Sequence, residues 1–340
     1  MYKNNVGSRC RGIARLAATL VGGLLAAGVQ AQDYGPQHSD VPAFVEKMQI
    51  EHGFSAEHVQ QVLDQAVRQE AILKAIARPA ERVKPWHEYR AIFITDKRIE
   101  SGLAFWDEHA EALARAEKEY GVEPEIILAI IGVETFYGGN MGSYRVIDAL
   151  TTLGFDYPPR ADFFRRQLES YLVLTREQQM DPLTLKGSYA GAMGYGQFIP
   201  SSYQAFAVDF DHDGVVDIWN NPVDAIGSVA NYFHQHKWQH GAAVAIAADV
   251  EGDQVAQGIT LEQGLEARKT VAELQRLGWT PRTQLEQDAE VMAFEFDAGE
   301  RMQYWLGLNN LYVITRYNRS VMYAMVVHQL ADLLREARPQ

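Results

Sequence analysis

One stretch of this chain would be apolar on every side if it formed a helix, and it carries an acid near its end. Residues 124–139 read PEIILAIIGVETFYGG. Their apolar residues leave no polar helical face, so we expect a helix that is buried on all sides. Pro124 suits a first helical turn and the glycine pair at 138–139 suits an end, which places Glu134 in the last turn. Any fold of this chain must build a core around this segment.

The position of Glu134 predicts an unusual acid. Apolar surroundings favour the neutral carboxyl, and the negative end of the helix dipole acts in the same direction. A carboxyl that stays protonated near neutral pH can serve as a general acid. The alternative is a structural glutamate that a neighbouring arginine or backbone amide satisfies, since structural pairs also shift pKa values. On this helix alone both interpretations stay open.

The first 31 residues have the three regions of a secretory signal peptide. Four basic residues precede an apolar stretch at 16–29, and the sequence VQA at 29–31 is a small-x-small cleavage site. The apolar stretch is shorter than the roughly 18 residues that span a bilayer. The single cysteine, Cys10, lies before this stretch, which argues against a lipoprotein signal. We therefore predict cleavage after Ala31, a periplasmic location and no membrane anchor.

Charge narrows the range of partners. The 340-residue chain has a net charge of −13, which becomes −17 without its first 31 residues, because these contain four basic and no acidic residues. This balance argues against a nucleic-acid partner and against attraction to an anionic membrane surface. Without cysteines, the exported chain has no disulfide and must rely on packing or on a metal.

Helical periodicity dominates the rest of the chain and gives way to strand patterns in one part. We predict a mainly α (α+β) protein with these divisions: a signal peptide at 1–31, an N-terminal helical domain at 32–85, a core at 86–240, a small β-rich domain at 241–310 and a C-terminal segment at 311–340 that returns to the core.

Within these divisions, several elements are specific enough to be tested. The expected strands are at 243–250 and 289–296, with a capped helix at 270–277 between them. Residues 311–317 are expected to continue the sheet or its border. One long helix is expected at 95–120 and a final one at 320–337, whereas the aromatic segment 140–159 is expected to be rich in loops.

An acidic loop at 209–217 matches the first nine positions of an EF-hand. Carboxylates stand at positions 1, 3, 5 and 9, and the turn glycine stands at position 6. Position 12 holds Asn220 in place of the usual glutamate, so Asp224 is the likelier closing ligand. The predicted ligands of a structural Ca²⁺ are Asp209, Asp211, Asp213, the Val215 carbonyl, Asp217 and Asp224. Sodium is the alternative ion, a solvated acidic turn is the alternative without metal, and no organic cofactor is expected.

Several motifs in order give the chain a family resemblance. These are Glu134-Thr135-Phe136-Tyr137-Gly138, then GAMGYGQFIPSSY at 191–203, PVDAIGSVANYF at 222–233 and TRYN at 315–318. Together with the acidic loop, they resemble the lytic murein transglycosylase B family (glycoside hydrolase family 103). The likeness covers nearly the whole exported chain and is strongest from Trp86 onward.

The resemblance implies an architecture and a reaction. It implies an α domain, a lysozyme-like core with an EF-hand-like metal loop, and a small β domain. It implies cleavage of the β-1,4 bond between N-acetylmuramic acid and N-acetylglucosamine in peptidoglycan, with a 1,6-anhydromuramoyl product. Glu134 would first protonate the glycosidic oxygen and then accept the proton of the muramoyl 6-hydroxyl, which is the internal nucleophile.

The resemblance also implies binding roles for eight side chains around the cleft: Ser188, Gln197, Arg160, Tyr89, Tyr232, Tyr317, Asn318 and Tyr323. Several have structural alternatives. Ser188 could cap a turn, Arg160 could be a solvated surface charge, and Tyr232 and Tyr323 could be core residues. The residue before Arg160 is Pro159, where relatives can have a second arginine, and this departure puts stem-peptide recognition in doubt.

Three other functions compete with this interpretation. A hydrolytic, lysozyme-like muramidase needs a second carboxylate, about 5 Å away if retaining and about 6.5–9.5 Å away if inverting. Asp148, Asp156 and Asp162 fall in or beside loops and caps, which disfavours this role. A non-catalytic, calcium-stabilised peptidoglycan-binding protein would not need Glu134, and a calcium sensor would need paired loops. We expect a monomer whose partners are glycan strands, with cell-wall synthases or amidases as candidate protein partners.

Overall fold

The computed structural model describes residues 33–77 and 84–338. By its internal contacts the chain divides into residues 1–31 and 32–340, and every described residue belongs to the second unit. The predicted signal peptide therefore lies outside the described residues. No helix within the described ranges is long and apolar enough to cross a bilayer.

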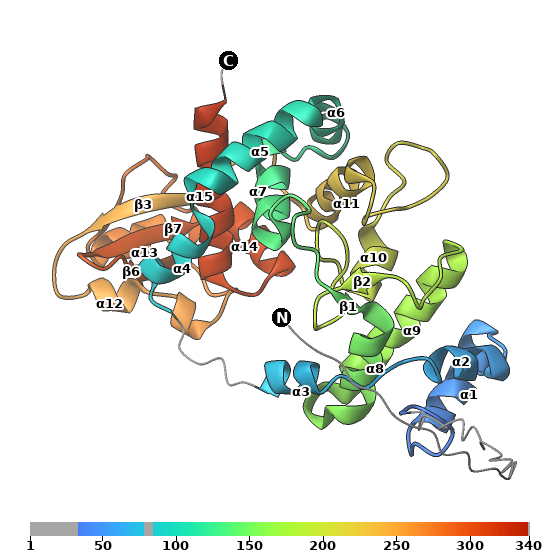
Figure 1. The fold of residues 1–340 in the computed structure, drawn as a ribbon. Coiled ribbons are helices and arrows are strands. Elements are labelled where there is room, and N and C mark those ends of the chain that lie inside the picture. Colours follow the sequence, from blue (N-terminus) through green and yellow to red (C-terminus); the bar gives the residue numbers. More distant parts are fainter. Residues whose placement is uncertain (1–32, 78–83, 339–340) are drawn as a thin grey trace, which may run out of the picture. The chain divides into compact units, whose positions relative to one another are not determined.

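Three short helices begin the described chain and pack on later ones (Figure 1). They are α1 (Val41–His52), α2 (Ala56–Leu63) and α3 (Glu70–Ala77). α1 packs against α2 and α9 (Ala161–Glu177), and α3 packs against α8 (Val146–Asp156). Ser55 caps α2 by accepting a hydrogen bond from the His58 N–H at 3.0 Å, as its residue type favours.

The middle and the end of the chain are also mainly helical. The remaining long helices are α4 (Trp86–Phe93), α5 (Asp96–Glu108), α6 (Ala110–Tyr120), α7 (Pro124–Thr135), α10 (Pro200–Phe206), α11 (Pro222–Gln235), α14 (Asn309–Tyr317) and α15 (Val321–Ala337). A two-residue ladder joins β1 (Tyr144–Arg145) to β2 (Lys186–Gly187), and a 3₁₀ turn, η1 (Pro158–Arg160), precedes α9. The predicted mainly α class is confirmed.

The prediction of one helix over 95–120 was wrong. The helix breaks at His109, whose backbone leaves the helical region at φ −117° and ψ 25°. Both halves contact α7, but their other partners differ, because α5 also contacts α15 and α6 also contacts α11. A single straight helix could not bury Phe105 and Leu113 against both sets of partners, and tertiary packing overrides the continuous local pattern.

Two further segments form helices that their composition concealed. Residues 140–159, expected to be loops, contain α8, in which every residue but Asp156 is buried. A helix buried on all sides lacks the alternation that marks an amphipathic one. Residues 311–317, expected to extend the sheet, lie in α14, because Leu311, Val313 and Ile314 pack with α15 instead of a strand.

A five-stranded antiparallel sheet occupies the predicted β-rich region. Its strand order is β4-β6-β7-β3-β5. The strands are β3 (Ala245–Val250), β4 (Lys269–Thr270), β5 (Trp279–Pro281), β6 (Glu290–Asp297) and β7 (Met302–Gly307). The short helices α12 (Val255–Gly258) and α13 (Val271–Arg276) and the 3₁₀ turn η2 (Leu261–Gln263) complete this region. The predicted strands near 243–250 and 289–296 and the helix at 270–277 are confirmed.

The helix predicted to organise the core does so. From Glu125 to Val133 every residue of α7 is buried, as the apolar sequence predicts. α7 packs against α15, the last helix of the chain (Figure 1). Tyr323 near the start of α15 contacts Glu134 near the end of α7, and Arg335 near the end of α15 pairs with Glu125 near the start of α7. The two helices are therefore antiparallel.

The N-cap of α15 can be tested by mutation. The Ser320 hydroxyl accepts a hydrogen bond from the Tyr323 N–H at 3.3 Å and caps the helix. Ser320→Ala should lower the free energy of unfolding by about 1 kcal/mol, the usual cost of losing an N-cap, measured by urea denaturation. Ser320→Asp, which retains a capping oxygen, should restore most of it, and equal losses in both variants would contradict the capping role.

Candidate active site

Glu134 combines a buried setting with one direct hydrogen bond. It lies in the last turn of α7, and its Oε1 accepts a hydrogen bond from the Tyr323 hydroxyl at 2.6 Å. Burial raises the pKa of Glu134 to about 7, while the Tyr323 hydrogen bond acts against this rise by stabilising the ionised form. No charged side chain of the described residues contributes to the shift. The carboxyl can thus hold or release a proton near neutral pH.

Three tyrosines predicted to line the cleft surround this carboxyl. Burial, and then the nearby Glu134 carboxylate, raise the pKa of Tyr89, Tyr317 and Tyr323, so all three hydroxyls stay protonated at neutral pH. Tyr89 comes from α4, Tyr317 from the end of α14 and Tyr323 from the start of α15. The structure therefore brings together residues from four separate helices. Tyr232 packs against the Tyr317 ring at 4.7 Å and is only 7 % exposed, so it supports this group from behind.

The glycine-rich stretch joins the same group. The Tyr317 hydroxyl donates to the Gly196 carbonyl at 2.5 Å, and the Thr135 hydroxyl donates to the Tyr195 carbonyl at 2.9 Å. Gln197 follows with a left-handed backbone, φ 50°, and its side-chain nitrogen donates to the Gly194 carbonyl at 3.0 Å. These contacts hold residues 194–197 beside the end of α7.

The other predicted binding residues lie at the margins. The Ser188 hydroxyl accepts from the N–H groups of Ala190 and Ala192 at 3.3 and 3.0 Å, which is the turn-capping alternative, although its own proton can still be donated. Asn318 is exposed directly after Tyr317. Arg160 is exposed, and its guanidinium lies over the Phe163 ring at 4.3 Å. No recorded contact joins Arg160 to the residues around Glu134.

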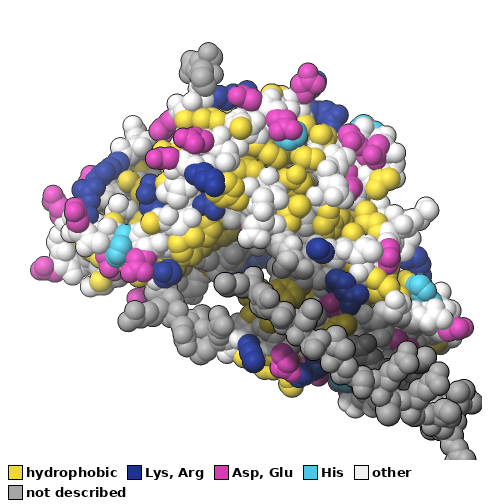
Figure 2. Space-filling view, in the orientation of Figure 1, with side chains coloured by type: hydrophobic (Ala, Val, Ile, Leu, Met, Phe, Trp, Pro, Cys, Tyr) yellow, Lys and Arg dark blue, Asp and Glu magenta, His cyan; other side chains and the backbone are white. Residues whose placement is uncertain are grey.

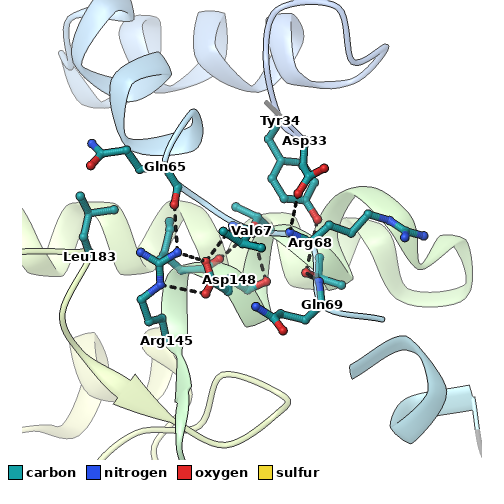
Figure 3. Close-up of polar contacts among 12 residues, drawn as sticks. Asp33, Tyr34, Gln65, Val67, Arg68, Gln69, Arg145, Asp148 and Leu183 are labelled. Carbon is teal, nitrogen blue, oxygen red and sulfur yellow. Dashed lines mark hydrogen bonds and ion pairs between the residues drawn. The ribbon is translucent and has the colours of Figure 1, made fainter. Parts of the chain in front are cut away.

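Asp148, the first acid that could assist Glu134, is engaged in structural contacts. Asp148 is only 4 % exposed. Its two oxygens accept from the Arg145 guanidinium at 2.7 and 2.8 Å, and one of them also accepts from the Val67 N–H at 2.9 Å (Figure 3). This carboxylate therefore ties the N-terminal helices to α8. It has no role left as a base beside Glu134.

Asp156 and Asp162 are also engaged elsewhere. Asp156 accepts from the Tyr34 hydroxyl at 2.8 Å and pairs with Arg68 at 3.2 Å. Asp162 is exposed and pairs with Arg165 at 2.5 Å. With Asp148, these contacts account for every second acid that the sequence offered near the cleft. Within the described residues, Glu134 stands without a carboxylate partner.

Arg98 is a positioning residue that the sequence does not reveal. Arg98 on α5 donates to the Gly132 carbonyl in α7 at 3.1 Å and to the Phe93 carbonyl at the end of α4 at 2.6 Å. Its guanidinium also lies 4.9 Å from the centre of the Phe136 ring. Arg98 thus fixes the helix that carries Tyr89 against the helix that carries Glu134. An arginine in an amphipathic helix gives no sequence signal for such a contact.

The predicted metal loop brings three of its acids together. Ligand oxygens of Asp209, Asp211 and Asp213 lie within 4.8 Å of one another, and Gly214 takes the left-handed turn conformation at φ 94°. No ion pair within the described residues involves these carboxylates. Hard oxygen donors that converge without a cationic partner fit a calcium ion.

Two further predicted ligands, Asp217 and Asp224, accept hydrogen bonds from backbone N–H groups. Asp217 accepts from the N–H groups of Trp219 and Asn220, both at 2.9 Å. Asp224 is fully buried and accepts from the N–H groups of Phe210 and Asp217 at 2.7 and 2.8 Å. Asp224 thus closes the loop through backbone hydrogen bonds.

Comparison with known proteins decides the family. The family model described as transglycosylase SLT domain matches residues 36–332. A curated relative, the membrane-bound lytic murein transglycosylase B of Escherichia coli K12, is 45 % identical over an alignment of 306 residues, and the match covers 87 % of this chain and 83 % of the relative. The chain belongs to the lytic murein transglycosylase B family. This lytic transglycosylase is accordingly an enzyme that acts on peptidoglycan, as its motifs predict.

Solved structures agree with this assignment. The soluble lytic transglycosylase SltB1 of Pseudomonas aeruginosa is 55 % identical, covers 87 % of this chain and 98 % of its own, and superposes with a TM-score of 0.84. E. coli Slt35 in complex with calcium is 44 % identical, with 90 % and 96 % coverage and a TM-score of 0.83. SltB3 of P. aeruginosa in complex with NAG-anhNAM-pentapeptide is 29 % identical, with 86 % and 78 % coverage and a TM-score of 0.76.

The raised pKa of Glu134 predicts a pH-dependent effect on stability. An unfolded glutamate ionises near its ordinary pKa of 4.5, whereas the folded carboxyl ionises near 7. Between these values only the unfolded state loses its proton, so the wild type loses stability as the pH rises. Glu134→Gln cannot titrate. Its free energy of unfolding should therefore match the wild type near pH 4 and exceed it by up to about 3 kcal/mol above pH 7, measured by denaturation across this range.

A second variant separates the two causes of the shift. Tyr323→Phe removes the hydroxyl that stabilises the ionised carboxylate, so the pKa of Glu134 should rise above 7 and the pH window should widen upward. Tyr317→Phe, which removes a hydroxyl bonded to Gly196 instead, should leave the window in place. A stability difference for Glu134→Gln that is independent of pH would show that the carboxyl is not perturbed.

Proposed function

We propose that this enzyme cleaves the N-acetylmuramic acid–β-1,4–N-acetylglucosamine bond with one carboxyl, Glu134, acting as acid and then as base. The observation that carries the proposal is the isolation of Glu134. It has a pKa near 7 and a Tyr323 hydrogen bond, and the candidate second acids are held by Arg145, Arg68 and Arg165. A single carboxyl suits a reaction whose nucleophile belongs to the substrate.

The steps balance with Glu134 alone. The protonated carboxyl gives its proton to the glycosidic oxygen as the bond from that oxygen to C1 of the muramoyl sugar breaks. The 6-hydroxyl oxygen of the same sugar then bonds to C1, and its proton passes to the Glu134 carboxylate. No water is consumed, and the acid returns to its starting state. The internal hydroxyl reacts readily because it is held on the same ring as C1.

The residues around Glu134 suit this chemistry. The hydroxyl of Tyr323 would hold the carboxylate in place between the two proton transfers. Tyr89 and Tyr317 would present aromatic faces and hydroxyls to the sugars, with Tyr232 behind them, and Gln197, Ser188 and Asn318 would hydrogen-bond substituents of the rings. Arg160 would meet a lactyl or peptide carboxylate at the margin. A relative holds a fragment named NAG-anhNAM-pentapeptide, which contains the anhydro end that this reaction would produce.

A calcium ion would brace the loop before α11. The ligands would be carboxylate oxygens of Asp209, Asp211, Asp213 and Asp217 and the carbonyl of Val215. Asp224 closes the loop through its hydrogen bonds from the Phe210 and Asp217 N–H groups. The support is the convergence of three acids and the calcium complex of Slt35. The ion would neutralise the loop and hold the start of α11, which carries Tyr232, with sodium as the alternative occupant.

The remaining expectations extend this proposal to the whole protein. The chain would be exported, lose residues 1–31 and act in the periplasm as a monomer on glycan strands. Residues 32–85, 86–240 and 241–310 would form the helical, catalytic and β-rich domains, with 311–340 returning to the core. The hydrogen bonds of Tyr317 to Gly196 and of Tyr323 to Glu134 support this last point.

Product analysis tests the mechanism. The exported form should release from purified sacculi muropeptides that are lighter by one water than the hydrolysed disaccharides and resistant to borohydride reduction. Glu134→Gln should lower the rate by at least about 100-fold, the usual contribution of a general acid, while it still folds. The assay is mass spectrometry of the released fragments.

The outcomes separate the three functions. Reducible products would mean that water is the nucleophile and that the enzyme is a hydrolytic muramidase. Retained binding without products, for wild type and Glu134→Gln alike, would leave a non-catalytic binding protein. Asp148→Asn is a matched control, because it removes a buried carboxylate that is tied to Arg145 and should cost stability without changing the kind of product.

Calcium should stabilise the fold through the acidic loop. For a weak site with Kd of roughly 10⁻⁴ to 10⁻³ M, calcium at about 10 to 100 times Kd should raise the free energy of unfolding by about 1.5–3 kcal/mol. Asp211→Asn should abolish this gain, whereas Asp253→Asn, an exposed acid outside the loop, should retain it. Thermal unfolding with calcium and with a chelator measures both, and an equal calcium response in the two variants would place the ion elsewhere.

A further inference from the structure

One face of the sheet is covered over only part of its width. The strand register places Phe294 and Phe296 of β6 beside Trp305 and Gln303 of β7. Both phenylalanines are buried, and Phe296 stacks on Trp86 of α4 at 4.6 Å. The opposite face is covered by a separate apolar cluster that includes Val271, Leu274 and Trp279. Ala245 of β3 and Trp305 of β7 also pack against the main apolar core, and Trp305 lines a hollow as well.

A hollow lies on this part of the sheet. It is a cavity of about 340 Å³ whose lining includes Ala247, Asp249, Arg282, Arg301, Gln303 and Trp305. The register explains its shape: Ala247 of β3 pairs with Trp305 on one side and lies beside Arg282 on the other. A small side chain between two large ones leaves a depression. Its volume falls at the lower end of the range for small-molecule sites.

Two polar atoms in the lining lack partners. The indole Nε1 of Trp305 and the amide Oε1 of Gln303 are buried and make no hydrogen bond to any described residue. Their residues are two apart on β7 and so point to the same face. An unpaired buried donor or acceptor is costly and rare in native proteins. Both side chains are half-buried and line the hollow, so rotation about their torsions would bring these two atoms to its surface.

The missing partners have complementary chemistry. Trp305 offers an N–H donor and Gln303 a carbonyl acceptor, and a secondary amide between them could satisfy both, through its own carbonyl and its own N–H. The indole would also give an apolar surface for a methyl group or a sugar face. A group that combines these features is an acetamido group or a peptide unit.

Charge at the rim adds a second feature. Arg301 is exposed and has no side-chain partner among the described residues. Within the same residues, Arg282 pairs only with Asp249, in an exposed ion pair at 2.7 Å, which stabilises little. The two guanidiniums would attract a carboxylate next to the bound amide. Figure 2 shows basic and acidic side chains interspersed with apolar ones on one face of the molecule. Because the chain as a whole has a net charge of −13, attraction by a general basic surface does not explain such a preference.

We propose that this hollow is a second binding site, which takes an amide next to a carboxylate as found in the N-acetylmuramoyl-peptide part of peptidoglycan. The identity of the ligand rests on the proposed function, whereas the chemistry of the site rests on Trp305, Gln303 and Arg301. None of these residues contacts Glu134. The site would hold the enzyme on the wall through the β-rich region while the Glu134 cleft processes a strand.

Binding can be followed at the Trp305 indole itself. The chain has six tryptophans, so indole N–H resonances of the ¹⁵N-labelled exported form are few, and Trp305→Phe identifies one of them. In the Glu134→Gln background, which prevents turnover, N-acetylmuramoyl-L-alanyl-D-isoglutamine should shift this resonance in a saturable way. Gln303→Leu, which keeps the Trp305 indole as the probe, should weaken the binding of the same ligand about fivefold or more, as expected for one lost hydrogen bond.

Ligand and control variants define the chemistry. N-acetylmuramic acid and the free dipeptide each contain an amide and a carboxylate, and a shift with either supports the site and shows whether sugar or peptide is recognised. Chitotetraose has amides without a carboxylate and should bind more weakly. Arg301→Ala should remove the advantage of the anionic ligands, whereas Arg276→Ala, an exposed arginine on α13, should retain it.

Clear results would overturn the proposal. An indole resonance that does not move at tens of millimolar ligand would mean that Trp305 and Gln303 satisfy each other instead. Equal binding of chitotetraose, or an unchanged affinity in Arg301→Ala, would remove the carboxylate from the site. The test is independent of turnover: cleavage of sacculi without an indole shift refutes only this site, and a shift without cleavage refutes only the proposed reaction.

Discussion

The hydrogen bond between Tyr323 and Glu134 is the contact on which the candidate site depends. It joins residues 189 positions apart and exists only because α7 and α15 lie antiparallel, with the Glu125–Arg335 pair at their other ends. Apolar side chains along α7 remove water from the Glu134 carboxyl and favour its neutral form. The tyrosine hydroxyl limits that effect, so burial and one hydrogen bond together set a pKa near 7. Neither alone would give a carboxyl that both donates and accepts a proton.

Local patterns predicted the parts of the fold and site that depend on local chemistry. The apolar run around Glu134 predicted a buried helix, and the alternate acids at 209–213 predicted a convergent loop, which the turn at Gly214 brings about. The cap at Thr270 is equally local. In each case the residues that cause the feature lie within one or two turns of it.

The features that were predicted wrongly, or not predicted at all, depend on contacts with residues far away in the chain. His109 breaks a continuous helical pattern because its two halves, which both contact α7, must also meet two different helices, α15 and α11. α14 is helical because α15 covers it. Arg145 lies only three residues before Asp148, but nothing near Asp148 in sequence shows that the Val67 backbone, 81 positions away, also occupies one of its oxygens. The sequence could list acids that might assist Glu134, but only the packing of the N-terminal helices on α8 removes this one from the list.

Directly after Glu134, the backbone carries strain that the surrounding contacts must offset. Phe136 and Tyr137 are consecutive non-glycine residues in the left-handed region, at φ 54° and 57°, at a cost of roughly 1–2 kcal/mol each. Arg98 contacts the Phe136 ring and the Gly132 carbonyl, and Thr135 bonds the Tyr195 carbonyl, so the turn is fixed from two sides. A reaction with an internal nucleophile needs no second base, but it needs the acid in one place for two proton transfers. A rigid, strained turn behind Glu134 meets that need better than another charged group would.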